Sequence, residues 1–173
     1  MVYPPVTQFE TRALRVAAQA PLRVVVGDAA VLTRAGTARL LEEAGCVVPA
    51  QAGDARELLR KVRAHRPDVV VTDDPVAARQ VRHEVRGVVV LADEPKHAKT
   101  FLEDGSEGVA FLLKPGLTDA SRLADAVARV ARGQTVLDPA VVADMVRRRR
   151  RGALTERERD VLEETAVLRA HAA

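Results

Sequence analysis

Cysteine and aromatic residues are scarce in this sequence of 173 residues. Its one cysteine, Cys46, excludes an internal disulfide and any metal site built from several thiolates. Tryptophan is absent, and the aromatic side chains are three phenylalanines and one tyrosine. Alanine, with 30 residues, and valine, with 28, make up a third of the chain. The core must therefore be built from small and branched aliphatic side chains.

Long hydrophobic runs are missing as well. No stretch reaches about 18 consecutive apolar residues, the length that a membrane helix needs. The first 20 residues, MVYPPVTQFETRALRVAAQA, lack the basic start and apolar stretch of a secretory signal, so we expect a cytoplasmic protein without membrane contact. With 47% hydrophobic and 29% charged residues, the composition is that of a globular protein, and the length suits one domain with an appendage.

The net charge of +3 is concentrated at one end of the chain. Residues 1–145 hold 19 basic and 19 acidic side chains, whereas residues 146–173 hold 8 basic and 5 acidic ones. Any attraction for nucleic acid must therefore lie in the last 28 residues. The candidates for phosphate contact are Arg147, Arg148, Arg149, Arg150 and Arg151, although a solvated linker is the simpler interpretation.

From Pro21 onward, short apolar runs alternate with amphipathic segments. The runs LRVVV, CVVPA, DVVVT, GVVVL and VAFLL predict strands at 22–26, 46–50, 68–72, 87–91 and 109–113. Helical spacing predicts helices at 30–44, after Asp54, and at about 76–85, 95–104 and 118–132. This alternation predicts an α/β, flavodoxin-like (βα)5 fold with a parallel sheet of order 2-1-3-4-5. Beyond Gly133, the segment GQTVLDP predicts a turn and 139–151 another helix.

Charged residues follow three of the predicted strands. Asp28 follows the first, Asp73 and Asp74 follow the third, and Lys114 follows the fifth. Because the carboxyl ends of parallel strands meet at one edge of the sheet, we expect these side chains to converge on one pocket. Carboxylates in this arrangement can hold Mg²⁺, and an opposing lysine can neutralise the charge of a bound phosphoryl group.

The stretches RVVVGD, RPDVVVTD, LEDGSEGVAFLLKPG and RGQTVLDP, in this order over residues 22–139, resemble bacterial response-regulator receiver domains of the NarL/FixJ type. The resemblance implies that Asp73 is the phosphoacceptor, that Asp28 and Asp73 bind Mg²⁺, and that Lys114 contacts the phosphoryl group. It also implies that Ala92 and Phe111 take the two switch positions. The Lys114–Pro115 peptide bond is often cis in the family.

The sequence departs from the family pattern at three points. Ala29 replaces the second acid, which contacts the metal directly in the family, so Mg²⁺ affinity should be weakened. Ala92 replaces the serine or threonine whose hydroxyl binds the phosphoryl group in the family, so phosphorylation could occur without changing the switch. Phe111 is then simply a core residue. Only 19 positions separate Asp73 from Ala92, fewer than is usual in the family. The third helix, predicted at about 76–85, and the loop before it must therefore be short.

The charged positions also have plainer interpretations. Asp28 can be only a helix cap or a solvated loop residue. Asp74 could replace the lost acid, but its side chain should point away from that of Asp73. Lys114 can be a structural partner of Asp28 or Asp73 in a pocket without chemistry, and Cys46 is most simply a small buried hydrophobe.

The tail resembles the start of a second family. The segment Leu154–Leu162, LTERERDVL, is similar to the opening of a LuxR-type DNA-binding domain, but only 19 residues follow Leu154. We therefore expect DNA contact only through an output domain that this chain lacks. The predicted division has four parts. They are an N-terminal extension with helical spacing at 1–20, a receiver at 21–133, a linker with a helix and the arginine run at 134–153, and the remnant of a helix-turn-helix domain at 154–173.

These patterns lead to the hypothesis of an atypical response regulator that controls transcription in its full-length form. A homodimer, a ligand or a partner would set its activity more than phosphorylation of Asp73. One alternative is a conventional receiver that a sensor kinase phosphorylates on Asp73. Another is an interaction module that pairs with a second regulator and blocks its DNA binding. We expect no enzymatic activity, because no nucleophile–base pair or phosphate-binding glycine loop is found, and no cofactor beyond weakly bound Mg²⁺.

Overall fold

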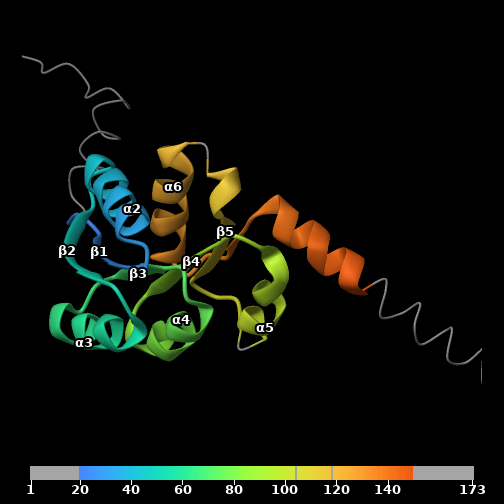
Figure 1. Ribbon diagram of the computed structural model, residues 1–173, viewed down its shortest axis with the longest axis horizontal. Coiled ribbons are helices and arrows are strands. Elements are labelled where there is room, and N and C mark those ends of the chain that lie inside the picture. The colour runs from blue at the N-terminus through green and yellow to red at the C-terminus, as the bar shows by residue number, and fades with distance from the viewer. Residues whose placement is uncertain (1–19, 104, 118, 150–173) are drawn as a thin grey trace, which may run out of the picture.

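A parallel sheet organises the part of the chain that the structure describes. The computed structural model describes residues 20–103, 105–117 and 119–149, with the side chains of Lys99 and Thr100 left out. Within these ranges, six strands lie in the order β2-β1-β3-β4-β5-β6, and every pairing is parallel. Helices cover both faces of the sheet (Figure 1). The predicted flavodoxin-like order of the first five strands is confirmed.

Five strands match the predicted apolar runs to within two residues. They are β1 (Arg23–Gly27), β2 (Val47–Ala52), β3 (Val69–Thr72), β4 (Gly87–Ala92) and β5 (Val109–Leu113). Strands β3 and β4 are buried along their whole length, whereas β2 lies at an edge and is only partly buried. Valine suits the central strands because its branched side chain packs well on a pleated surface that is covered on both faces.

The helices form two layers (Figure 1). One layer contains α2 (Val31–Glu43) and α6 (Ala120–Val130), and the other contains α3 (Ala55–His65), α4 (Pro75–Val81) and α5 (Ala98–Leu102). Each layer packs on its own cluster of buried side chains, with Leu41 and Val127 in the first cluster and Leu58 and Phe111 in the second. Short 3₁₀ helices lie at η1 (Arg82–Glu84), η2 (Pro95–His97) and η3 (Lys114–Gly116).

The connection between β3 and α4 is very short, as the sequence spacing predicts. Asp73 and Asp74 are the only residues between Thr72 at the end of β3 and Pro75 at the start of α4. The helix has only seven residues. Proline is compatible with this first helical position because its ring presets a helical φ and no backbone donor is needed there. The short helix holds Asp73 and Asp74 directly at the strand end.

The segment after α6 differs from the sequence-based prediction. The predicted turn contains a short strand, β6 (Val136–Leu137), which pairs with β5 through Ala110 and Phe111. Two residues are too few to show strand periodicity, and the pairing depends on the open edge of β5. The predicted helix that follows is present over 139–149, and its last two residues lie outside the described residues.

Other predictions can be compared only in part. The Lys114–Pro115 bond is trans, as are all peptide bonds of the described residues, so the expectation of a cis bond is wrong. The proposed extensions at 1–20 and 154–173 lie outside the described residues, apart from residue 20. None of the helices in the described ranges combines the length and apolar character needed to cross a membrane.

Candidate functional site

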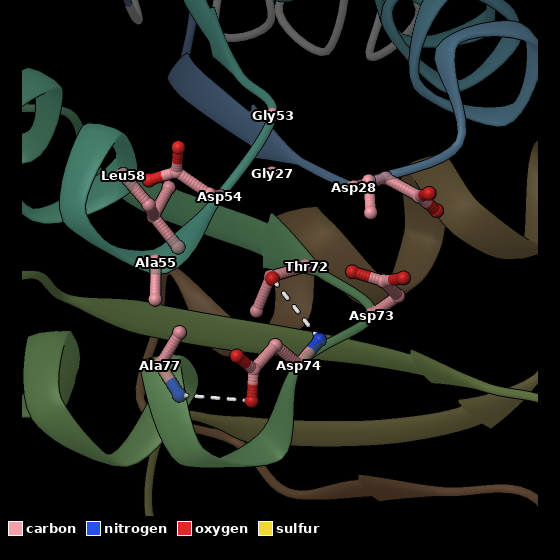
Figure 2. Close-up of a pocket in the computed structure, with 11 residues that line it drawn as sticks. Gly27, Asp28, Gly53, Asp54, Ala55, Leu58, Thr72, Asp73, Asp74 and Ala77 are labelled. Atoms are coloured by element: carbon pink, nitrogen blue, oxygen red, sulfur yellow. Dashed lines mark hydrogen bonds between the residues drawn. The ribbon is translucent and has the colours of Figure 1, made fainter.

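The carboxyl ends of β1, β3, β4 and β5 bring the predicted site residues to one edge of the sheet. Asp28 follows β1, Asp73 follows β3 and Lys114 follows β5. Asp28 and Asp73 project side by side from neighbouring strand ends (Figure 2). The two strand ends are also joined directly, since the backbone N–H of Asp73 donates to the carbonyl of Gly27 at 3.2 Å. The predicted convergence of the two acids and the lysine is therefore present in the structure.

Asp28 is held rigidly at the base of this pocket. Its side chain is only 4% exposed. Oδ1 accepts a hydrogen bond from the backbone N–H of Ala30 at 2.7 Å, and the carbonyl of Asp28 accepts one from the Arg34 guanidinium. A buried carboxylate needs such partners because burial without them is costly. Asp28 thus stabilises the loop before α2 and still leaves Oδ2 for a cation.

Lys114 supplies that cation. Its Nζ lies 3.3 Å from Oδ2 of Asp28, 4.0 Å from Oδ2 of Asp73 and 3.9 Å from Oδ2 of Asp93. The contact with Asp28 is also a hydrogen bond. One ammonium group therefore faces three carboxylates, and its single positive charge neutralises only part of their negative charge.

Asp73 lies in an environment that disfavours its charge. Burial raises the pKa of its carboxyl above the ordinary value, and the negative charge of Asp28 raises it further. Lys114 opposes both effects without cancelling them. A nucleophilic carboxylate that is partly desolvated and close to a lysine is suited to accept a phosphoryl group, because the lysine can neutralise the added charge.

Asp74 does not join this pocket. Its Oδ1 accepts hydrogen bonds from the backbone N–H groups of Val76 at 2.8 Å and Ala77 at 3.1 Å, so it caps α4 (Figure 2). Its own N–H donates to Oγ1 of Thr72 at 3.2 Å. The cap engages Oδ1 of Asp74, and this argues against a role for Asp74 in place of the acid missing at position 29.

A cavity of about 250 Å³ opens beside Asp73 on the side of α3 and α4. Leu58, Ala55 and Ala77 form its apolar part, and the carboxylates of Asp28, Asp54, Asp73 and Asp74 lie around it (Figure 2). Asp54 is also engaged as a helix cap, since it accepts a hydrogen bond from the N–H of Glu57. No lysine or arginine lines the cavity.

A second hollow, of about 360 Å³, opens at Ala92, one of the two positions that the family resemblance assigns to a switch. It lies between Asp73, Ala92 and the loop from Asp93 to His97. Ala92 ends β4 with a methyl group and offers no hydroxyl towards Asp73. Phe111 is fully buried and packs against Phe101, with ring centroids 6.3 Å apart and an interplanar angle of 55°. Phe111 is a core residue in this structure, as the sequence favours.

The metal-binding capacity of the pocket is small. Ala29 is exposed and has no ligand atom in its side chain. Among the described residues, no group of three or more histidine, cysteine or carboxylate side chains is arranged to hold a metal ion. Asp28 and Asp73 offer two carboxylates, which is enough for Mg²⁺ when water and phosphoryl oxygens complete its shell. The two acids therefore fit a Mg²⁺ ion, which would share both of them with Lys114.

Asp93 is the pocket residue that sequence reasoning missed. The signal was available, because Asp93 lies directly after Ala92 at the carboxyl end of β4. A prediction from strand-end residues alone reaches Ala92 and stops one residue short of Asp93. The loop geometry brings the next side chain to Lys114 instead.

The three arginines of the run that the structure describes line neither hollow. Arg147, Arg148 and Arg149 are exposed on the helix at 139–149. Asp144 pairs with Arg147 at 3.9 Å and with Arg148 at 2.6 Å on this helix. Arg150 and Arg151 lie outside the described residues. Part of the positive charge predicted to contact phosphate is therefore neutralised locally.

Solved structures of similar fold place the chain in a family. The signal receiver domain of NarL from Mycobacterium tuberculosis is 32% identical, with 67% of this chain and 100% of that chain covered and a TM-score of 0.58. A LuxR-family two-component response regulator from an Aurantimonas species is 24% identical, with coverage of 75% and 99% and a TM-score of 0.62. The isolated receiver domain of RcsB from Salmonella enterica serovar Typhimurium is 18% identical, with coverage of 72% and 98% and a TM-score of 0.59.

The first of these similarities decides the family, and the other two support the fold alone. The chain belongs to the receiver domains of two-component response regulators. Its structural relatives include NarL and LuxR-family regulators. No protein-family model matches the chain, and no curated protein matches it.

Proposed function

We propose that this receiver controls transcription through an output domain in the full-length protein, and that its activity is set by protein contacts more than by phosphorylation of Asp73. The observation that carries this proposal is the pairing of Lys114 with three carboxylates, next to alanine at positions 29 and 92. A phosphoryl group on Asp73 has to draw Lys114 away from Asp28 and Asp93. Even then, Ala92 has no hydroxyl with which to detect it, and a ligand shifts an equilibrium only through differential contacts.

Mg²⁺ has a minor role in this proposal. Asp28 and Asp73 would hold the ion, and its charge would help to neutralise a phosphoryl group during transfer. Asp28 stays bound to the N–H of Ala30 in any case. We further propose a cytoplasmic homodimer whose heterologous partner is a sensor kinase or another regulator.

The experiment compares the native chain with one in which the two missing groups are restored. Both proteins are treated with acetyl phosphate and Mg²⁺ for intact-mass measurement, and with beryllofluoride and Mg²⁺ for oligomeric state. We expect no change of assembly for the native chain and a clear response for the Ala29→Asp/Ala92→Thr variant. Adding Asp73→Asn to that variant should remove its response, which controls for modification elsewhere.

The conventional receiver is the rival function, and the convergence of Asp28, Asp73 and Lys114 favours it. Stoichiometric phosphorylation of the native chain together with a shift to a dimer would overturn our proposal in favour of this rival. Under the rival function, Asp73→Asn in the native chain abolishes both the modification and the change of assembly.

A further inference from the structure

The loop after β4 contacts the acidic pocket through Asp93. This residue directly follows Ala92, and its side chain is 79% exposed. Its Oδ2 nevertheless lies 3.9 Å from Nζ of Lys114, within ion-pair distance. The methyl group of Ala92 cannot make a polar contact, so Asp93 supplies charge at the place where the loop begins.

Lys114 is a fixed partner for this exposed acid. It is held from the other side by Asp28, whose carboxylate is buried and bonded to the N–H of Ala30. The backbone of Lys114 begins the turn η3, in which its carbonyl accepts from the N–H of Leu117 at 3.1 Å. The ammonium group is therefore anchored on the sheet, whereas Asp93 lies on the loop.

The other ion pair described for this loop is exposed to solvent. The hollow of about 360 Å³ opens between Asp73 and the loop residues Glu94, Lys96 and His97. Glu94, the next acid along the loop, pairs with Lys96 at 3.0 Å, and both of these side chains are more than half exposed. A segment with few buried contacts opens easily, so a single ion pair can change its population of states.

We propose that Asp93 is a positioning residue, whose ion pair with Lys114 holds the loop at 93–97 against the acidic pocket without a phosphoryl group. The proposal rests on the proposed function and names the regulation of the same site. A hydroxyl at position 92 would draw the loop inward only when Asp73 carries a phosphoryl group. The carboxylate at position 93 draws it towards Lys114 in the unmodified protein.

The strength of this contact is that of an exposed ion pair. Such pairs change an equilibrium by up to about five-fold, and salt screens them over a Debye length of about 10 Å at 0.1 M. The loop is therefore biased rather than locked. Anything that takes Lys114 away from Asp93, such as a partner's carboxylate or a phosphoryl group, releases it.

Hydrogen exchange of the loop amides of Glu94, Lys96 and His97 tests the proposal in the full chain, with rates corrected for the intrinsic effect of sequence. Asp93→Asn should lower their protection by about two- to five-fold, in line with an exposed pair. Asp93→Glu should restore it, because the carboxylate is returned. Glu94→Gln is the matched control on the same loop. In this variant, the protection of the Lys96 and His97 amides should be at least as high as in Asp93→Glu.

Added salt gives an independent measurement. Raising NaCl should lower protection in the native chain towards that of Asp93→Asn and have little effect on Asp93→Asn itself. Unchanged protection in Asp93→Asn, or an equal loss in Glu94→Gln, overturns the proposal. A gain of protection in the native chain on addition of beryllofluoride and Mg²⁺ would contradict the proposed function but not the role of Asp93. The role of Asp93 is tested separately, by comparing the variants without beryllofluoride.

Discussion

At the scale of single residues, the pocket has a strong excess of negative charge. Asp28, Asp73 and Asp93 share one ammonium group, and the nearby Asp74 carboxylate is committed to a helix cap. An exposed carboxylate such as Asp93 keeps its hydration, whereas Asp73 loses part of it. The cost of desolvation therefore falls on Asp73 rather than on Asp93.

Replacing Asp73 by asparagine tests that cost. Burial and the charge of Asp28 raise the pKa of Asp73, so the folded protein binds its proton more tightly than the unfolded chain does. The protonated Asp73 carboxyl contributes fully to the stability of the folded state below its ordinary pKa of 3.8. This contribution is lost as the pH rises through the raised pKa of the folded protein. Asp73→Asn should therefore raise the free energy of unfolding at neutral pH, and the gain should shrink as the pH falls towards 3.8.

Urea unfolding at several pH values measures this difference. The control is Asp125→Asn on α6, whose side chain is 65% exposed and whose change in stability should stay within about 0.5 kcal/mol. A loss of stability in Asp73→Asn at neutral pH would show that its contact with Lys114 outweighs burial.

At the scale of elements, the short junction between β3 and α4 defines how the pocket is built. The helix starts at Pro75, so its first free N–H groups lie beside the strand end and need an acceptor. Asp74 satisfies two of them. A longer loop would separate the cap from the strand end, but here Asp73 and the cap are adjacent in the chain. The helix start therefore restrains the position of Asp73.

Removing this cap should destabilise the protein. Asp74→Ala leaves two backbone donors without their acceptor and should cost about 1 kcal/mol, within the range of about 0.5 to 2 for N-cap residues. Asp74→Asn keeps an acceptor oxygen and should recover most of the loss. Chemical denaturation followed by circular dichroism measures both. An equal loss in the two variants would mean that charge, and not the hydrogen bonds, makes the contribution.

At the scale of the whole molecule, one sheet separates two aliphatic cores. Leu41 of α2 is buried in one core, and Leu58 of α3 is buried in the other. Central strands contribute alternate side chains to both, for example Val70 and Val71 of β3. Because the same strands belong to both cores, loosening either face should weaken the whole sheet, and the two layers should unfold together.

Truncation on each face tests this coupling. Leu41→Ala and Leu58→Ala should each lower the free energy of unfolding by about 2 to 5 kcal/mol, through lost burial and a cavity. Each variant should keep a single transition in urea, seen at one midpoint by circular dichroism and by methyl resonances from both faces. Leu32→Ala, at a position that is 88% exposed, should change stability by no more than about 0.5 kcal/mol. Separate midpoints for the two faces would contradict a single cooperative unit.

Most of the fold was predictable because its rules act locally along the chain. Runs of valine mark strands that are covered on both faces, and breaks such as Pro67 and Gly45 separate them from helices. Parallel strands with helical crossovers then leave few topologies. The strand β6 was missed because its two residues carry no period of their own, and it pairs only because β5 offers an open edge.

The candidate site divides in the same way. Chain order alone placed Asp28, Asp73 and Lys114 at strand ends, because the fold rule brings those ends together. The side-chain commitments required three dimensions: Asp74 turns to the helix start, and Asp93 reaches Lys114 from the next loop. Local patterns specify which residues approach one another, whereas the direction of each side chain depends on hydrogen-bond and charge partners that are distant in sequence.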